Sequence, residues 1–192
     1  VGERFGLKTR VINDGRASAW GEYLKGNAAG ADPLLCLFFG TGIGIGLMDG
    51  GEPYTGFRNA AGEIGHTMFR PGGRRCPCGD LGHFEAYCGG RAITERAAAE
   101  IAEQPPAALG VGKWTAGAVV DAQGLDGAAG ATARAILAAA AEAATTMVAN
   151  ACTLLNPGAV VLGGGVLAGW PALRGHIEAA RRRRARRRRG SA

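Results

Sequence analysis

The order of apolar and polar positions along this chain predicts strands in its first half and helices in its second. A continuous apolar run over 34–39 has the length of a strand, and such a run indicates a buried strand. The alternating glycines over 40–46 predict a tight turn and a returning strand over 43–48, which together make a hairpin. Before this hairpin, 8–12 reads as a short strand and 17–25 as a small helix.

The second half of the chain predicts helices, followed by one more strand. The predicted helices cover the region after residue 84 with a break at Gly89-Gly90, then 91–103 up to Pro105-Pro106, then 115–122 with Thr115 as its cap, and finally the alanine-rich 127–153. Asn156-Pro157-Gly158 ends the last of these helices, and 159–162 predicts a short strand that runs into Gly163-Gly164-Gly165. A strand, a glycine cluster and then a helix is the usual build of a nucleotide site.

Two segments show neither the alternation of apolar and polar residues typical of a strand nor the spacing of apolar residues typical of a helix. Residues 49–83 read as glycine-rich loop and turn, and a loop of that length is uncommon unless function or a metal organises it. From Arg181 onward the chain is almost entirely arginine and cannot bury a core, so we expect a disordered tail over 181–192.

Charge and composition exclude several classes of protein. The formal net charge is +6, but eight arginines lie in one run over 181–189, and the rest of the chain carries −2. A broad basic face for nucleic acid is therefore not indicated, and only the arginine run could bind a polyanion. We see no uninterrupted apolar stretch of bilayer length and no hydrophobic segment after the first residues, which argues against a membrane protein and a signal peptide.

The strongest chemical signal is a set of metal-ligand residues. His66, Cys76, Cys78 and His83 follow the spacing His-x9-Cys-x-Cys-x4-His, and neighbouring glycines let the backbone fold around an ion. Structural zinc prefers such a closed tetrahedral set, and four protein ligands leave no open position for catalysis. The alternative is two free thiols and two surface histidines. Five cysteines is an odd number, and this grouping suits a reducing compartment, so we expect a cytoplasmic protein.

Carboxylates close to this cluster and near residue 14 are weaker signals. Glu63 and Glu85 flank the metal residues and could accept hydrogen bonds from sugar hydroxyls, although each alone reads more readily as a solvated surface group. Asp14 could take a proton from an attacking hydroxyl during phosphoryl transfer. In isolation, however, Asn13-Asp14 is better explained as a helix cap.

Two glycine-rich turns could approach phosphate groups. In Gly40-Thr41-Gly42 the backbone amides and the Thr41 hydroxyl could donate to phosphate oxygens, and Gly163-Gly164-Gly165 follows a strand in the same way. The first turn is not a P-loop, because no Gly-Lys-Ser/Thr follows it. Each turn is weak evidence alone, since glycine turns are common in hairpins.

Taken together and in this order, these motifs resemble the ROK family (repressors, open reading frames and kinases), whose kinases include bacterial glucokinases. The resemblance runs from about Glu3 to Gly169. The segments that carry it are Val11-Ile12-Asn13-Asp14, Gly40 to Gly44, Ala61 to His66, Cys76 to Glu85 and Asn156 to Gly165. It implies an α/β fold of the actin-like ATPase (ribonuclease H-like) type. This chain would hold mainly the large C-terminal domain with its zinc-binding loop.

The resemblance also implies roles for individual residues. Asp14 matches the family's catalytic base, and the residues matching its sugar contacts are Asn13, Glu63, His66 and Glu85. Gly40, Thr41 and Gly42 match a phosphate-binding turn, and Gly163, Gly164 and Gly165 match the glycines on the adenosine side. His66, Cys76, Cys78 and His83 match the zinc ligands. The implied cofactors are ATP, Mg²⁺ and a structural Zn²⁺, and the implied assembly of the full-length protein is a homodimer.

Three features depart from the family pattern. His83 stands where the family usually has a third cysteine, and imidazole is also a good zinc ligand. The family's first phosphate motif, of the type Asp-Gly-Gly-Thr, does not occur in the chain, so we expect 1–180 to be a ROK-type region without its N-terminal phosphate-binding part. The arginine run stands where the family continues with further helices and a strand.

The sequence therefore predicts an ATP-dependent hexose kinase acting on the 6-hydroxyl, with glucose the first candidate substrate. This stretch is expected to be inactive alone. The alternative is a sugar-responsive transcriptional regulator of the same family, in which the domain binds a sugar without catalysis. Asp14 favours the kinase, because a sensor does not need a base. The residues do not distinguish glucose from mannose, fructose or an N-acetylated hexosamine.

Overall fold

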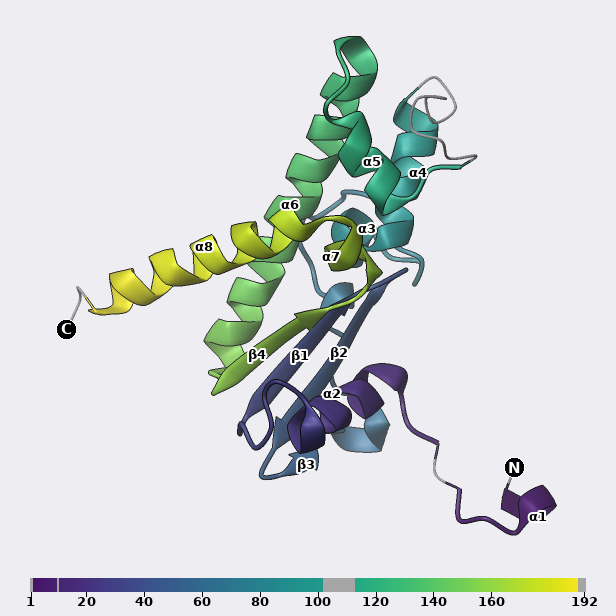
Figure 1. Cartoon of the computed structure of the whole chain (residues 1–192), viewed down its shortest axis with the longest axis vertical. Coiled ribbons are helices and arrows are strands. Elements are labelled where there is room, and N and C mark those ends of the chain that lie inside the picture. The colour runs from purple at the N-terminus through teal and green to yellow at the C-terminus, as the bar shows by residue number, and fades with distance from the viewer. Residues whose placement is uncertain (1, 10, 102–112, 190–192) are drawn as a thin grey trace.

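A central four-stranded sheet carries the fold (Figure 1). A computed structural model describes residues 2–9, 11–101 and 113–189. The strand order is β3-β2-β1-β4, with β1 at Leu34–Phe39, β2 at Ile43–Asp49, β3 at Glu52–Pro53 and β4 at Ala159–Gly163. β1 pairs antiparallel with β2 and parallel with β4. The predicted hairpin and the predicted strand over 159–162 are thus confirmed.

β1 is apolar throughout because both faces of the sheet are covered. Leu35, Leu37 and Phe39 belong to the larger core on one face. Leu34 and Cys36 belong to a smaller core on the other face. Successive strand residues point to opposite faces, so a strand buried on both sides reads as a continuous apolar run.

Helix α2 (Asp14–Lys25) covers the face of the smaller core. It starts three residues before the predicted 17–25, because Asn13 acts as its N-cap and accepts a hydrogen bond from the Arg16 amide. The helix approaches β2 closely at Gly46, where an added Cβ would overlap the Ala19 methyl and lie 2.6 Å from the Gly15 carbonyl oxygen. Small residues at this crossing therefore set the helix-to-sheet distance.

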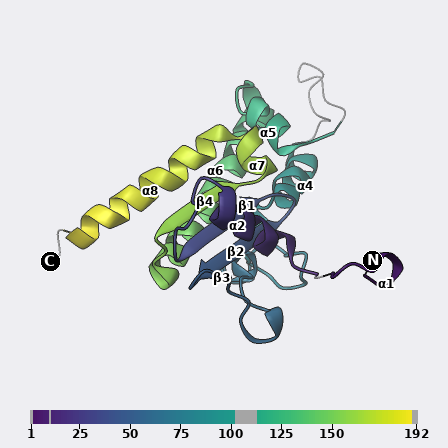
Figure 2. The same ribbon diagram turned by 60° about the horizontal axis from the view of Figure 1, so that its bottom comes forward.

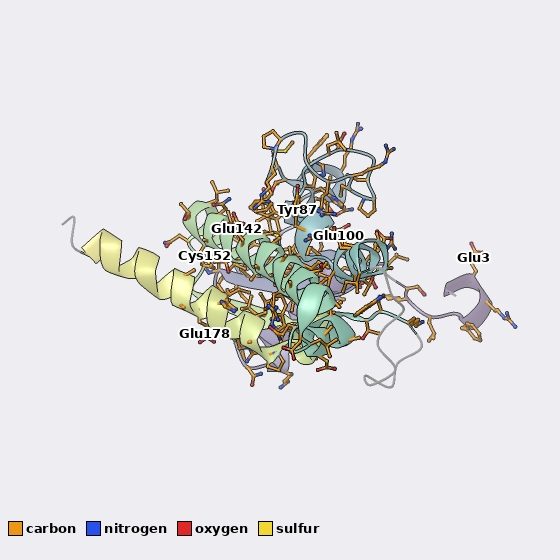
Figure 3. All side chains as sticks on the ribbon, turned by 90° about the horizontal axis from the view of Figure 1, so that it is seen from above. Glu3, Tyr87, Glu100, Glu142, Cys152 and Glu178 are labelled. Carbon is orange, nitrogen blue, oxygen red and sulfur yellow. The ribbon has the colours of Figure 1, made fainter. Side chains whose placement is uncertain are left out.

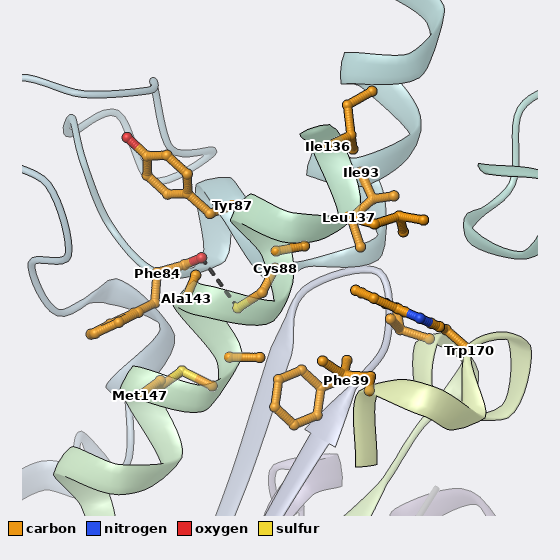
Figure 4. Close-up of a cluster of buried hydrophobic side chains, with 14 of the residues drawn as sticks. Phe39, Phe84, Tyr87, Cys88, Ile93, Ile136, Leu137, Ala143, Met147 and Trp170 are labelled. Atoms are coloured by element: carbon orange, nitrogen blue, oxygen red, sulfur yellow. Dashed lines mark hydrogen bonds between the residues drawn. The ribbon is translucent and has the colours of Figure 1, made fainter. Parts of the chain in front are cut away.

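Helix α6 (Gly127–Leu155) is the centre of the larger core. Its buried positions recur every three or four residues, and Ile136, Leu137 and Met147 lie among them (Figure 4). Burial of side chains of this size contributes about 1.5–3 kcal/mol each. The helix ends at Asn156, which adopts a left-handed conformation with φ 44° and is followed by Pro157.

By length and composition alone, α6 could cross a membrane, contrary to our expectation that the chain holds no such stretch. Half of its most apolar window is buried inside the protein. It packs against α3, α4, α5 and α8, and Figure 1 shows it at the centre of these helices. The apolar composition is thus accounted for by packing in the core.

The remaining helices complete the layer over the larger core. They are α3 (Glu85–Cys88), α4 (Gly90–Glu100), α5 (Ala116–Ala122), α7 (Gly165–Gly169) and α8 (Pro171–Arg189), with the short 3-10 turns η1 (Phe57–Asn59) and η2 (Ile64–His66) in the long loop. Thr115 caps α5 as predicted, by accepting a hydrogen bond from the Ala118 amide. The helix break at Gly89 is confirmed. The predicted helix end at Pro105-Pro106 lies outside the described residues.

Two sequence predictions differ from the structure. Residues 7–9 and 11–13 form no strand, because no strand among the described residues lies beside them to pair with, and Val11 is 94% exposed. In Figures 1 and 2 this segment runs away from the sheet to α1 (Gly2–Phe5). The backbone of 181–189, predicted to be disordered, continues α8 as a helix to Arg189. Arginine has a high helix propensity, and no proline interrupts the run.

The close crossing of α2 and β2 gives a paired stability prediction. We expect Gly46→Ala to destabilise the protein by about 1–3 kcal/mol, because the new methyl overpacks the contact with Ala19. Gly21→Ala is the control, since Gly21 lies within α2 and a methyl group added there would have no atom within 4 Å. It should stabilise the protein by about 0.5–1 kcal/mol. Urea unfolding of both variants checks the opposite signs, and equal shifts would contradict the close-packing argument.

Candidate functional site

One cavity joins the N-terminus of α2 to the glycine turn of the hairpin. It has a volume of about 480 Å³, and Asn13, Asp14 and Glu85 line it. Gly40, Thr41 and Gly42 form another part of its wall. Six of the predicted site residues, distant in the sequence, thus lie around one space.

The N-terminus of α2 serves both structure and site. The cap interpretation of Asn13 is confirmed by its bond from the Arg16 amide, 3.2 Å long. Asp14 is exposed, and its Oδ1 accepts a hydrogen bond of 2.8 Å from the Gly15 amide. The carboxylate is therefore held at the start of the helix, where the helix dipole favours negative charge, and it faces the cavity.

Arg16 is a residue that sequence reasoning missed. It is buried, and its Nη2 donates hydrogen bonds of 2.8 Å to the carbonyl oxygens of Asn59 and Ala61. These bonds tie the long loop to α2, next to the cavity. The sequence does not reveal that Arg16 is buried and bonded to the loop, because both acceptors are backbone groups more than forty residues away.

The glycine turn is fastened to the break between α3 and α4. The Gly90 and Arg91 amides donate hydrogen bonds of 2.9 Å to the carbonyl oxygens of Gly40 and Thr41. The Glu85 carboxylate accepts a bond of 2.8 Å from the Ile43 amide. The Glu85 carboxylate also lies against Gly42, where any side chain would collide with it. A side chain at residue 42 would therefore displace the Glu85 carboxylate.

The second glycine cluster lies at the same end of the sheet. Gly163 pairs with Phe38, so the carboxyl ends of the parallel strands β1 and β4 lie side by side. Gly164 has φ +101°, and an added Cβ would lie 2.7 Å from the Phe39 amide nitrogen. Loops at the carboxyl ends of parallel strands are the usual location of ligand sites in α/β sheets. Gly163, Gly164 and Gly165 do not line the 480 Å³ cavity.

The four predicted metal ligands converge. One ligand atom from each of His66, Cys76, Cys78 and His83 lies within 4.8 Å of all the others. Cys76 Sγ is 3.4 Å from His66 Nδ1, and Cys78 Sγ is 3.2 Å from His83 Nδ1. Bond lengths near 2.3 Å to sulfur and 2.1 Å to nitrogen imply comparable spacings around a tetrahedral zinc. The donor set and its geometry therefore fit a four-coordinate metal.

Residues 66–83, which carry the four predicted metal ligands and which we call the metal loop, pack against a cluster of aromatic side chains. Phe69 stacks on Phe84 at 5.0 Å and meets Tyr87 edge to face at 5.1 Å. Arg70 lies over Phe69 and forms a salt bridge of 2.6 Å with Glu142 on α6. Phe84 and Tyr87 come from the start of α3, while Cys88 turns into the core and its thiol donates to the Phe84 carbonyl oxygen (Figure 4). This aromatic cluster supports the loop that carries the predicted metal ligands.

Two predicted sugar residues do not line the cavity. Glu63 is exposed at the start of η2, and His66 faces the metal cluster instead. Gly65 packs against Ile43, which keeps η2 close to the hairpin without closing the cavity.

Burial raises the pKa of the Cys76 thiol to about 11, so a metal is needed to hold it as a thiolate. None of the five cysteines, all of which lie among the described residues, forms a disulfide.

Comparison with known proteins identifies one family. The model of the ROK family matches residues 1–189. A glucokinase of Streptomyces coelicolor is 40% identical over 97 residues, which is 50% of this chain and 31% of that protein. The chain thus spans about a third of the length of this relative.

Solved structures extend the likeness to the fold. A ROK family glucokinase of Streptomyces griseus, in complex with glucose and AMPPNP, superposes with a TM-score of 0.76 and 31% identity over 95% of this chain and 60% of that one. A ROK family transcriptional regulator superposes with a TM-score of 0.75 and 26% identity over 95% of this chain and 46% of that one. The predicted actin-like α/β fold is supported by these neighbours and by the mixed sheet.

The contact between Gly42 and Glu85 gives a local prediction. A methyl group at residue 42 would occupy the position of the Glu85 carboxylate and displace it, so that its hydrogen bond from the Ile43 amide would be lost. We expect Gly42→Ala to speed hydrogen exchange of that amide by at least about tenfold, the effect of losing one charge-assisted bond. Gly40→Ala is the control, because the nearest atom to its methyl would be 3.9 Å away. Unchanged protection of Ile43 in Gly42→Ala would show that the bond does not hold the turn.

Proposed function

This chain belongs to the ROK family, and we propose that the protein containing it phosphorylates a hexose at the 6-hydroxyl with ATP. The observation that carries the proposal is the shared cavity, in which the Asp14 carboxylate faces the glycine turn of the hairpin. A base beside a phosphate-binding turn is the arrangement that phosphoryl transfer to an alcohol requires.

In this proposal, Asp14 removes the proton from the sugar hydroxyl as the γ-phosphoryl group is transferred. Asn13 and Glu85 bind sugar hydroxyls from the same cavity. Glu85 uses Oε2 for the Ile43 amide, so its other oxygen is the one directed to the sugar. Glu63 and His66 complete the sugar contacts from η2. Since both lie outside the cavity wall, η2 would have to approach as the sugar binds.

The nucleotide would bind across the carboxyl ends of β1 and β4. Thr41 and Gly42 would donate backbone N–H groups to the phosphates, while the Gly40 N–H shapes the turn by donating to the Gly42 carbonyl oxygen. Gly163 to Gly165 would form the adenosine side of the site. Mg²⁺ neutralises the charge of the ATP phosphates, and positioning supplies much of the remaining rate enhancement. The complex of the Streptomyces griseus glucokinase with glucose and AMPPNP supports this assignment.

The cluster of His66, Cys76, Cys78 and His83 would hold a structural zinc. Four protein ligands close a tetrahedral site, so the ion would brace the loop and take no part in the chemistry. The position of Glu85 two residues after His83 links this brace to the cavity. Zinc would then stabilise the segment from which Glu85 reaches the glycine turn.

A sugar-responsive transcriptional regulator is the second candidate, supported by the regulator with a similar fold. The two functions differ in the need for Asp14, which only catalysis uses. Glucose is the first substrate to test, because the Streptomyces relatives are glucokinases. We further propose a cytoplasmic homodimer. The division into a ROK-type region over 1–180 and a separate arginine-rich segment over 181–192 also remains a proposal.

The kinase proposal predicts that Asp14→Asn removes phosphoryl transfer and spares glucose binding. The 192-residue chain contains no Asp-Gly-Gly-Thr segment, so alone it should give no turnover. The assay therefore uses the chain joined to the N-terminal segment of the Streptomyces coelicolor glucokinase. We expect kcat to fall roughly 10²–10⁴-fold, the usual contribution of a general base. Asp49→Asn, exposed at the end of β2, is the control.

Retained turnover in Asp14→Asn would refute the assignment of the base. Glucose binding without turnover by the unmodified chimaera would instead favour the regulator. The glucose affinity, measured by calorimetry in all three proteins, separates these results from a failure to fold.

The zinc proposal predicts loss of the metal in Cys76→Ser. We expect about one zinc ion per unmodified chain after dialysis and close to none in the variant, because a hydroxyl is a far poorer zinc ligand than a thiolate. Elemental analysis by mass spectrometry measures the metal content. Cys152→Ser on α6 is the control and should keep the metal, since Cys152 lies outside the cluster. Equal zinc in both variants would overturn the ligand assignment.

A further inference from the structure

A second recess lies between the metal loop and α4. Its narrow part, of about 70 Å³, is lined by Arg75, Arg91 and Glu95, and by the Thr41-Gly42 turn. Its wider part, of about 300 Å³, is lined by Arg74, Arg75 and Arg96 among others. Arg75, Ala86, Ala92 and Glu95 line both parts, so they form one continuous cleft. We call it the arginine cleft.

Two of its arginines have no acidic partner. Neither Arg75 nor Arg91 forms a salt bridge with any described residue, although both line the narrow part. The backbone of Arg75 is fixed by a bridge to Leu81 in the metal loop. The Arg91 amide is bonded to Thr41. The backbones of Arg75 and Arg91 are thus held in place, while their guanidinium groups remain available to bind a ligand.

The other two arginines share a single carboxylate. Glu100 accepts a bond of 2.7 Å from Arg74 and bonds of 2.9 and 3.0 Å from Arg96, and these partners hold the Glu100 pKa below its ordinary value. Arg96 Nη1 is buried, and it is the one buried side-chain donor among the described residues that lacks a partner. Figure 3 labels Tyr87 and Glu100, the two groups to which Arg74 is bonded. The cleft therefore has more donors than acceptors.

We propose that the arginine cleft binds the phosphate group of a small phosphomonoester, with Arg75 and Arg91 as its main contacts. Guanidinium groups bind phosphate oxygens by charge-assisted, often paired, hydrogen bonds. The narrow part suits a single phosphate group by its volume of about 70 Å³.

The carboxylates of the cleft argue against a long polyanion. Glu95 and Glu100 line the wider part, and a nucleic-acid backbone passing along it would meet their negative charge. The narrow part is lined by two carboxylates, Glu85 and Glu95, as well as by Arg75 and Arg91, so it suits a single phosphate group paired directly with the two guanidinium groups. The neutral hydroxyl-bearing part of a phosphomonoester would then lie beside Glu100 in the wider part. The ligand thus carries one anionic end and one end that donates hydrogen bonds.

The cleft shares a wall with the cavity of Asp14. Thr41, Gly42 and Glu85 line both spaces. A ligand in the narrow part would lie on the opposite side of the glycine turn from the proposed nucleotide phosphates. The inference concerns binding in the cleft, and it holds whether or not the proposed kinase activity is correct.

The test is a titration of the full 192-residue chain followed by amide NMR shifts. The probes are inorganic phosphate and glucose 6-phosphate, at an ionic strength held constant with sodium chloride. We expect the Thr41, Gly42, Arg91 and Ala92 amides to shift together. Arg75→Gln/Arg91→Gln should weaken this binding by at least about tenfold, since it removes both charge-assisted contacts. Neither side chain forms a salt bridge among the described residues, so the variant should fold.

The control variant is Arg4→Gln/Arg58→Gln, which removes the same charge from exposed positions outside the cleft. All proteins keep the arginine run over 181–189, so its contribution to phosphate binding is common to them. Shifts with inorganic phosphate identify the phosphate group as sufficient, and shifts with glucose 6-phosphate alone show that the wider part contributes. Absence of shifts at these amides with both probes, or equal affinity in the two double variants, would overturn the proposal.

Discussion

The bond between the Glu85 carboxylate and the Ile43 amide links the sheet to the metal loop. Glu85 begins α3, two residues after the predicted metal ligand His83, while Ile43 begins β2. Two further backbone bonds join the glycine turn to the break between α3 and α4. Together these contacts decide where the turn lies relative to Asp14, and hence the shape of the cavity.

The metal loop can hold Glu85 in position because it packs against its own cluster of aromatic side chains. The stack of Phe69, Phe84 and Tyr87 supplies apolar burial, and Arg70 connects it to α6. The four predicted metal ligands then have to be brought together only within a small part of this loop. A loop this rich in glycine would otherwise lose much conformational entropy on folding, which a bound metal would offset.

The likeness to glucokinases and to a regulator follows from a shared scaffold. One fold can host different functions, and the chemistry depends on a few groups placed around it. In this chain the cap residue Asn13 and the carboxylate Asp14 are adjacent at the start of α2. Helix capping and catalysis are therefore compatible roles for neighbouring residues, since one side chain bonds the backbone while the next faces the cavity.

The sequence alone determined the local elements and the metal set. β1 was predictable because an apolar run needs burial on both faces, and α5 because Thr115 is a typical cap. The convergence of His66, Cys76, Cys78 and His83 was predictable because these residues lie close together in the sequence with a spacing typical of metal ligands. Only the tertiary structure decided which distant groups meet. The role of Arg16 depends on backbone acceptors that the fold brings to it. The contact of Gly42 with the Glu85 carboxylate and the arginine cleft depend on side chains from distant segments, which leave no periodic pattern in the chain. The strand predicted over 8–12 failed for the same reason, since a strand requires a partner that its own residues cannot supply.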